Sequence, residues 1–282
     1  MHIEGRMEQA KDRLEVLERI KEYEKNGWWD KDVENDPPSK VLMPNEIDYL
    51  NKKLSSKIAT FFANKSGTKF FEKMIKNNQL IIKKVNGIEN LLAVQGGAIV
   101  TSNHFNACDN YAIYRAMKPY FPRKFRLWKV IREGNYTNSP PPFGFVMRNC
   151  NTLPLSSNTE TMKKFLTATK ELLERGEKIL IYPEQGMWWN YRKPRPTKNG
   201  AYSIAASNNV PIVPIFITME DSEFVGPDGF NIQAYTINFM PAIYPNPEFN
   251  KKENVSYMQE ENYRMCKECY EKFYQTPLTY EK

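Results

Sequence analysis

The chain has 282 residues, of which 41% are hydrophobic, 13% aromatic and 26% charged, and its formal net charge is +7. This composition indicates a globular protein with a substantial core, arranged as one large domain or two small ones. The longest apolar run, at 210–217, has about half the length that a membrane-spanning helix needs and contains two prolines. We therefore expect a protein that is neither exported nor membrane-spanning.

The N-terminal third is predicted to be helical. The first six residues, MHIEGR, look like a protease-cleavage remnant of an expression tag, so we take residues 1–6 as foreign and His104 as the only native histidine. Apolar residues at helical spacing predict one helix over 7–26 and another over about 44–63, joined by a turn-rich connector at 28–40. We assign 7–78 to an N-terminal helical region and 79–282 to the main domain.

A basic segment lies at the end of the helical region. Between positions 51 and 84 there are nine lysines and one acid, a balance of +8. Within it, Phe70 and three further apolar residues of the segment 69–76 fall on one helical face, bordered by Lys69, Lys73 and Lys76. A basic amphipathic helix is typical of an element that binds an anionic membrane surface. The alternative is that the apolar face packs on the protein's own core and the lysines are solvated.

From residue 79 the pattern changes to short β-rich runs separated by helices. A helix is expected from near Asp109, another over 158–176, opened by Ser157 with Glu160 as in a capping box and closed by Gly176, and a long one over about 252–275. Strands are expected within 79–85, 97–102, 125–131, 144–149, 178–183, 211–218 and 232–240. This alternation predicts an α/β fold with a mostly parallel central sheet flanked by helices, and an N-terminal helical extension.

The four cysteines are expected to be reduced thiols, because no secretory signal follows Met7. Cys266 and Cys269 form a single C-x-x-C pair in a charged helical stretch, without a second pair or a nearby histidine. This favours two residues on a helix surface over a zinc or redox site. We expect no metal site in the chain.

Polar clusters follow three of the expected strands, where functional groups collect in open α/β sheets. The first cluster contains His104 and Asp109. If His104 lies in the loop and Asp109 in the first helical turn, the carboxylate can orient the imidazole, whose other nitrogen can take a proton from a hydroxyl. A thioester substrate would then need no serine or cysteine nucleophile. A structural histidine at a strand end is the alternative.

Four sequence blocks strengthen the catalytic interpretation: NHFNACD (103–109), GFVMR (144–148), YPEQG (182–186) and VPIVP (210–214), with TKNGA (197–201) before the last. In this order, over about residues 79–218, they resemble the boxes of the glycerophospholipid acyltransferases, the family of 1-acylglycerol-3-phosphate acyltransferases. The resemblance implies an α/β acyltransferase fold and acyl transfer from acyl-CoA or acyl-carrier protein to a lysolipid hydroxyl. No cofactor besides this co-substrate is implied.

The resemblance also suggests roles for individual residues. His104 would be the general base and Asp109 the group that orients it. Glu184 and Gly186 would form part of the acceptor site, and Arg148 would help to hold the acceptor phosphate. The second box is compressed, because Arg148 lies four residues after Gly144. Cys108, inside the first box, could in principle form an acyl-enzyme, although the family does not use this position in that way.

The third box departs from the family pattern. Met187, Trp188 and Trp189 stand where the family has an arginine, so the identity of the acceptor head group is open. The two tryptophans could line a substrate pocket, or they could be core or membrane-interface aromatics. A phosphate favours charge-assisted, often bidentate donors, which a displaced loop could supply. The basic residues available there are Arg192, Lys193, Arg195 and Lys198.

The sequence thus favours a cytoplasmic enzyme, peripheral at the inner face of a membrane, that acylates a lysophospholipid, most simply 1-acylglycerol-3-phosphate. A different lipid hydroxyl, including that of an amino-acid-based lipid, is a related alternative. A non-catalytic membrane-lipid-binding protein is a third interpretation. The pI of about 9.0 would also suit nucleic acid, but no recognised nucleic-acid motif is present and none is expected as a partner.

Overall fold

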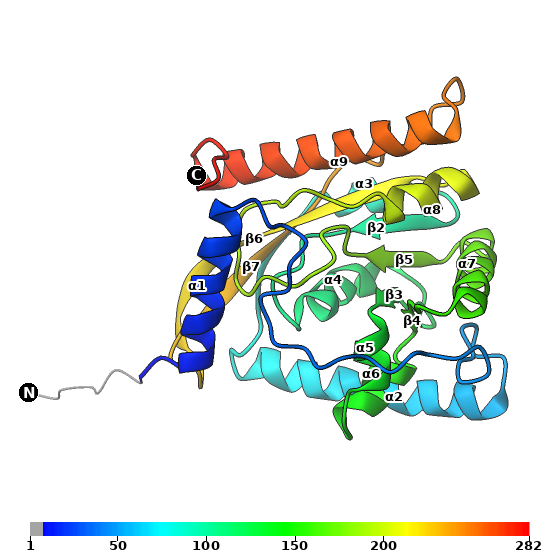
Figure 1. Ribbon diagram of the computed structural model, residues 1–282, viewed down its shortest axis with the longest axis horizontal. Helices are drawn as coiled ribbons and strands as arrows, with labels where there is room; N and C mark the ends of the chain where they lie inside the picture. Colours follow the sequence, from blue (N-terminus) through cyan, green and yellow to red (C-terminus); the bar gives the residue numbers. More distant parts are fainter. Residues whose placement is uncertain (1–7, 282) are drawn as a thin grey trace, which may run out of the picture.

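A twisted seven-stranded sheet forms the centre of the molecule in the computed structural model, which describes residues 8–281 (Figure 1). The expected cleavage remnant at 1–6 lies outside the described residues. The strand order is β1-β7-β6-β2-β5-β3-β4, and all neighbours run parallel except the β6–β7 pair. The predicted α/β fold with a mostly parallel sheet is confirmed.

Six of the seven strands coincide with predicted β-rich runs, and those at the centre of the sheet are buried on both faces. In β2, for example, Val100 belongs to the core on one face and Ile99 to the core on the other. The strands are β1 (Ile81–Asn86), β2 (Ala98–Thr101), β3 (Trp128–Ile131), β4 (Thr152–Pro154), β5 (Lys178–Ile181), β6 (Ile212–Val225) and β7 (Asn231–Phe239).

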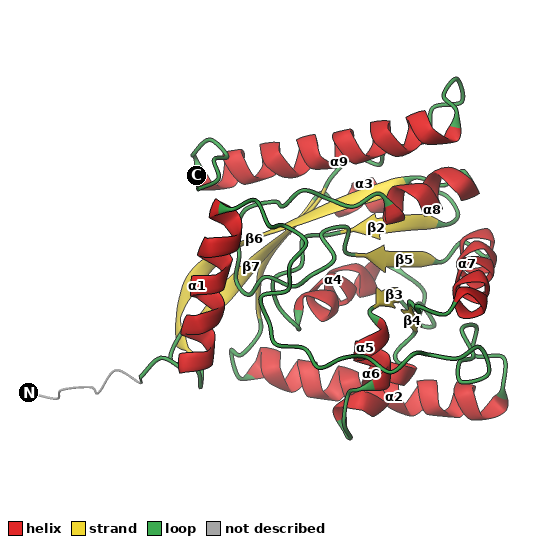
Figure 2. Cartoon of the chain, viewed as in Figure 1, coloured by secondary structure: helices red, strands yellow, loops and turns green. Residues whose placement is uncertain are grey.

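Helices cover both faces of the sheet (Figure 2). The core on one face includes side chains of α2, α3 and α4, and the core on the other includes side chains of α7, α8 and α9. The helices are α1 (Lys11–Lys25), α2 (Leu54–Lys76), α3 (Ile88–Leu92), α4 (Asp109–Met117), α5 (Glu133–Thr137), α6 (Phe143–Asn149), α7 (Thr159–Glu174), α8 (Gly200–Asn208) and α9 (Lys251–Tyr274), with a short 3₁₀ turn at Lys118–Tyr120.

The predicted helix over 44–63 is wrong in its first half. Residues 44–53 form turns, and the helix begins at Leu54 and continues to Lys76. It therefore contains most of the basic segment at 51–84. Asn51 adopts a left-handed backbone conformation, and the Asp48 carboxylate accepts a hydrogen bond from the backbone N–H of Lys53 at 2.8 Å. The apolar residues before Leu54, such as Tyr49, pack into the core instead of forming a helical face.

The predicted strand at 144–149 is also wrong, because this segment is helix α6 and the strand follows it as β4. The turn at Pro140–Pro142 starts the helix, and the backbone N–H of Gly144 donates to the carbonyl of Pro140 at 2.6 Å. A Cβ on Gly144 would lie only 2.0 Å from the Ser139 carbonyl oxygen, so glycine is required at this close approach. The run of apolar residues had a composition that fits either element.

Helix α7 was predicted with one error at its start. Asn158, not Ser157, is the N-cap, and its side chain accepts from the backbone N–H of Thr161 at 3.0 Å. The Ser157 hydroxyl donates instead to Glu133 at 3.0 Å. The chain leaves the helix through Gly176 in a left-handed conformation, as predicted. Of the helices in the described chain, none is both long and apolar enough to cross a bilayer.

Candidate active site

The loop that carries His104 is fixed where strand β2 ends. Asn103 is buried, its side-chain oxygen accepts from the backbone N–H of Ile217 at 2.9 Å, and its amide donates to the Ile217 carbonyl at 3.0 Å. On the other side, the His104 carbonyl accepts from the backbone N–H of Trp188 at 3.1 Å. The loop is therefore held between β6 and the segment that follows β5.

His104 and Asp109 are in direct contact. Asp109 is the first residue of α4 and is fully buried, and its Oδ2 lies 2.8 Å from Nδ1 of His104. The same oxygen accepts from the backbone N–H groups of Phe105, at 3.2 Å, and Asn106, at 3.4 Å. With Nδ1 engaged, Nε2 is the nitrogen that remains to accept a proton. The side chain of His104 keeps 20% of its surface exposed, so the ring is accessible.

Tyr182 completes the cluster and was missed by the sequence analysis. Its ring stacks on that of His104, with centroids 4.0 Å apart, and its hydroxyl donates to Oδ1 of Asp109 at 2.5 Å. Burial raises the pKa of Tyr182 well above its usual value, and the Asp109 charge adds to the increase, so the hydroxyl stays protonated and acts as a donor. Asp109 thus accepts hydrogen bonds at both oxygens, which fixes the plane of its carboxylate.

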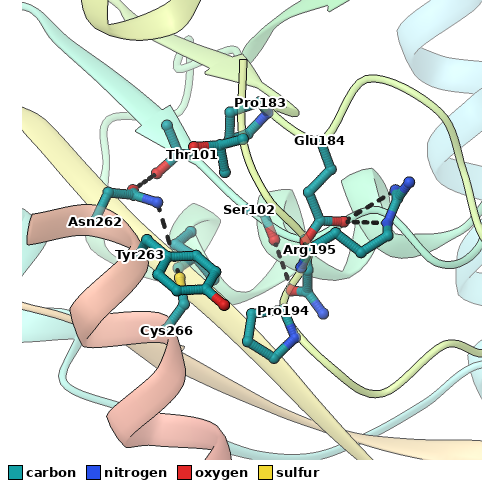
Figure 3. Close-up of a pocket in the computed structure, with 12 residues that line it drawn as sticks. Thr101, Ser102, Pro183, Glu184, Pro194, Arg195, Asn262, Tyr263 and Cys266 are labelled. Carbon is teal, nitrogen blue, oxygen red and sulfur yellow. Dashed lines mark hydrogen bonds and ion pairs between the residues drawn. The ribbon is translucent and has the colours of Figure 1, made fainter. Parts of the chain in front are cut away.

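Glu184 and Arg195 form a buried ion pair behind the histidine (Figure 3). The Nη2 of Arg195 lies 3.1 Å from Glu184 Oε2, and the backbone N–H of Arg195 donates to Oε1 at 2.9 Å. Glu184 Oε2 also accepts from the backbone N–H of His104 at 3.3 Å. The pair lines a small pocket of about 10 Å³, together with polar residues such as Asn262 from α9. Both partners, which we expected in the acceptor site, therefore make contacts within the protein.

A larger cavity of about 570 Å³ opens beside His104. Its wall includes apolar and aromatic side chains from both faces of the sheet, such as Phe71 and Phe165. Gly186 and Lys198, two of the predicted acceptor-site residues, also line it. Its size falls within the range of sites that enclose small molecules or parts of lipids.

The other predicted phosphate-binding residues make contacts elsewhere. Arg148 Nη1 donates to the carbonyls of Tyr136 and Ser139, each at 3.3 Å. Arg192 pairs with Asp221 at 2.7 Å, and Lys193 pairs with a buried glutamate of α1. Among the described residues that line the large cavity, these three cations are absent.

Trp188 and Trp189 are core residues. Both are buried in a cluster with Val16 and Ile20 of α1 and with Val33 of the connector. The indole N–H of Trp188 donates to the backbone carbonyl of Lys31 at 3.2 Å. The two tryptophans therefore fasten α1 and the connector to the segment that follows β5.

The cysteines lack the features of a reactive site. Burial raises the pKa of Cys108 to about 11, with a further contribution from the Asp109 charge, so the thiol is protonated at neutral pH. Cys266 is buried on α9 against the sheet, which differs from the expected surface position. Within residues 8–281 no cluster of three metal-ligating side chains occurs, and all four cysteines are free thiols.

The basic segment lies on α2, and all four residues predicted to face a membrane, Lys69, Phe70, Lys73 and Lys76, are exposed. Phe70 is 57% exposed, whereas the other apolar residues of 69–76 pack on the core, so Phe70 does not share their face as expected. Further apolar side chains of α2 are exposed toward its N-terminal end. We call this set the α2 outer face: Leu54, Ile58, Phe61, Phe62 and Phe70.

Residues 83–218, which hold His104, Asp109, Tyr182 and Glu184, match the model of the family described as Acyltransferase. Just under half of the chain therefore resembles the acyltransferase family. The chain is 28% identical over 136 residues to a chloroplastic 1-acyl-sn-glycerol-3-phosphate acyltransferase, BAT2, of Brassica napus. That match covers 46% of this chain and 36% of the relative, so the chain spans about a third of the relative's length.

A solved structure also resembles the chain. It is the 1-acyl-sn-glycerophosphate (LPA) acyltransferase PlsC from Thermotoga maritima, with 19% sequence identity and a TM-score of 0.45. The similarity covers 76% of this chain and 79% of that chain.

Proposed function

We propose that the protein transfers a fatty acyl group from an acyl thioester, acyl-CoA or acyl-carrier protein, to the hydroxyl of a lysophospholipid. The leading acceptor is 1-acylglycerol-3-phosphate. The observation that carries the proposal is the 2.8 Å contact of Asp109 with His104, which lines a 570 Å³ cavity, within a segment that matches the acyltransferase family.

In the proposed reaction His104 is a general base. Nε2 takes the proton of the acceptor hydroxyl while the oxygen attacks the thioester carbonyl, so a C–O bond forms. The tetrahedral intermediate then collapses, the C–S bond breaks, and the thiolate leaves with the proton from the imidazolium. A positioned base of this kind contributes about 10²–10⁴ in rate. No covalent acyl-enzyme is needed, because the thioester is already activated.

Asp109 supports this step in two ways. By accepting a hydrogen bond from Nδ1–H it selects the tautomer in which Nε2 is free, and its charge stabilises the imidazolium that forms. Tyr182 holds the carboxylate and packs against the imidazole, which restricts the ring to one orientation. Tyr182 is therefore a positioning residue.

We infer further that α2 docks on an anionic membrane, at the inner, cytoplasmic face. Three aromatic side chains of the α2 outer face, Phe61, Phe62 and Phe70, are each more than half exposed. Apolar burial and attraction of lysines to anionic lipid reinforce each other at a bilayer surface. Helix α2 also lines the large cavity through residues such as Thr68 and Phe71, so a bilayer held there would lie next to the proposed site.

The docking surface can be tested with vesicles that contain an anionic phospholipid. We expect Lys69→Glu together with Lys73→Glu, or Phe61→Ser together with Phe62→Ser, to weaken binding at least fivefold, and added salt to weaken wild-type binding. The control is Lys251→Glu with Lys252→Glu, which makes the same change of charge on α9, at the opposite edge of the molecule (Figure 1). Equal loss in the control, or equal binding to neutral and anionic vesicles at low salt, would contradict the assignment.

The function itself is tested with purified protein, acyl-CoA or acyl-carrier protein, and a panel of lysolipids, with products identified by mass. We expect a diacyl product from at least one lysophospholipid. A product only from another class of lipid hydroxyl would support the related alternative. Vesicle binding without acyl transfer to any acceptor would indicate a non-catalytic lipid-binding protein.

A further inference from the structure

Three cations line the cavity beside His104 among the residues described: Lys129, Arg132 and Lys198. Arg132 directly follows β3, the strand next to β5, so it lies at the same edge of the sheet as the residues after β5. The other basic residues predicted to hold a phosphate, Arg148, Arg192, Lys193 and Arg195, do not line this cavity. Arg132 is therefore the guanidinium that shares the cavity with the catalytic base.

Two aspartates of the connector form ion pairs with Arg132. Its Nη1 lies 3.0 Å from Asp36 Oδ2, and its Nη2 pairs with Asp32 Oδ2. Lys198, also in the cavity wall, lies 3.5 Å from the carboxylate of Asp30. A guanidinium with two donors turned to carboxylate oxygens has the geometry that binds a phosphate monoester equally well.

The Asp32 carboxylate also lies against Gly186. A Cβ at Gly186 would come within 3.0 Å of Asp32 Oδ1. Asp32 thus fills the space between Arg132 and the glycine of the third box, which is part of the same cavity wall as His104. Its oxygens stand where the anionic oxygens of an acceptor head group would meet Arg132.

The acidic segment is held at both ends, and its four acidic residues between positions 30 and 36 line the cavity. On one side, Trp188 holds Lys31 through the 3.2 Å hydrogen bond of its indole, and on the other the side-chain amide of Asn138 donates to the Pro38 carbonyl at 2.9 Å. We call residues 30–36 the acidic strap. Figure 1 shows the connector passing the carboxyl ends of β2 and β5.

We propose that Arg132, assisted by Lys198, is the subsite for the phosphate monoester of the acceptor, and that Asp32 and Asp36 of the acidic strap occupy it until that phosphate displaces them. This inference rests on the proposed function. The ion pairs are exposed, since the Arg132 side chain keeps 40% of its surface accessible and that of Asp36 keeps 57%. Exposed pairs contribute little net stability, so a phosphate can replace the carboxylates at a small loss of stability. A phosphate dianion carries more charge than a single carboxylate, and Lys198 adds a second positive charge to the wall of the same cavity.

The proposal predicts opposite changes of KM when Arg132 is replaced and when the two aspartates that pair with it are replaced. Arg132→Gln should raise the KM for 1-acylglycerol-3-phosphate at least tenfold and leave the KM for an uncharged monoacylglycerol acceptor within twofold. Asp32→Asn with Asp36→Asn should lower the KM for the phosphate acceptor three- to tenfold, with kcat within twofold, because the internal competitor is weakened. The control is Glu15→Gln with Glu18→Gln, the same change of charge on the exposed surface of α1.

A binding measurement separates the subsite from the reaction. With sn-glycerol 3-phosphate as the probe, calorimetry should show binding that Arg132→Gln weakens at least tenfold, and backbone amides 30–36 should exchange hydrogen faster in the bound state. Coenzyme A and dephospho-coenzyme A form the second arm, and equal binding of these two at wild-type Arg132 is expected. A preference for coenzyme A that is lost in Arg132→Gln would assign the subsite to the donor's 3′-phosphate and overturn the proposal.

The remaining outcomes distinguish a failure of the phosphate subsite from a failure of the proposed acyltransferase function. Product formation with an unchanged KM in Arg132→Gln would overturn the subsite and leave the acyltransferase function standing. Absence of product with every acceptor, but Arg132-dependent binding of glycerol 3-phosphate, would refute the proposed function and retain the subsite. A higher KM in the Asp32→Asn, Asp36→Asn variant would show that the carboxylates contact the acceptor themselves, and would overturn the proposal.

Discussion

Asp109→Asn isolates the contribution of charge at the proposed dyad. Two backbone N–H groups, those of Phe105 and Asn106, donate to Oδ2 of Asp109 together with the ring of His104. The amide oxygen of asparagine must therefore take the Oδ2 position, and its NH₂ group turns to the Tyr182 hydroxyl, which can accept. The substitution keeps the imidazole orientation and tautomer but removes the negative charge.

The expected loss follows from Coulomb's law. Two unit charges 4 Å apart attract by about 4 kcal/mol at an effective dielectric constant of 20, and the 2.8 Å hydrogen bond places the Asp109 carboxylate directly beside the ring. Allowing for the amide dipole that replaces the carboxylate, stabilisation of the imidazolium should fall by about 3–4 kcal/mol, which is roughly 10²–10³ in kcat. The KM values should change little, because Asp109 is buried away from the substrates.

The assay is thiol release from acyl-CoA at saturating lysolipid, with circular dichroism and urea denaturation as controls for folding. Asp109→Ala, which loses both charge and orientation, should be slower than Asp109→Asn. A folded Asp109→Asn variant with a kcat within threefold of the wild type would refute the reasoning, because the charge would then have no part in the reaction.

Two further predictions concern partly buried groups near the cavity. Burial lowers the pKa of Lys129 from 10.5 to about 8. Keeping Lys129 ionised in the folded protein therefore reduces stability below pH 8, and this penalty fades as the pH rises towards 10.5. Lys129→Met should raise the free energy of unfolding by about 1–3 kcal/mol at pH 7 and by less at pH 10. Urea denaturation at both pH values measures this, and an equal gain at both would contradict it. Cys108→Ala should keep thiol release within about threefold of the wild type, because the partly buried Cys108 is a protonated thiol. A collapsed rate, with an acyl adduct trapped on the wild-type protein, would reverse the assignment.

The sheet was predictable from sequence because buried parallel strands combine β-branched composition with short length and flanking turns. Strand β5, KILI, is an example in which every residue is buried. Helix α6 was not predictable in the same way, since its apolar run fits a strand equally well by composition. Its helical state depends on contacts with α2, such as that of Val146 with Gly67, which no local pattern encodes.

The contact between His104 and Asp109 was predictable because both residues of the proposed dyad lie within one strand–loop–helix unit, only five positions apart. Tyr182 was not, because it directly follows β5 and reaches Asp109 only through the pairing of β2 with β5, where Thr101 is opposite Ile181. The signal was present in the third box, which has Tyr182 before its proline, but nothing in the spacing showed that this ring stacks on His104.

The acidic strap illustrates the same limit on a larger scale. The connector was expected to be turn-rich, and its acids carried no functional signal. Their proximity to Arg132 depends on how α1 packs on Trp188 and Trp189, some 170 residues later in the chain. Long-range packing of this kind decides which charges meet, and therefore which cations remain for a substrate.

The central claim is that the imidazole of His104 removes the proton from a lipid hydroxyl. The most direct test compares wild-type protein with His104→Ala for thiol release from acyl-CoA in the presence of a lysophospholipid, with vesicle binding measured alongside. We expect the rate to fall by about 10²–10⁴ while vesicle binding is unchanged. An unchanged rate in a folded His104→Ala variant would contradict the account.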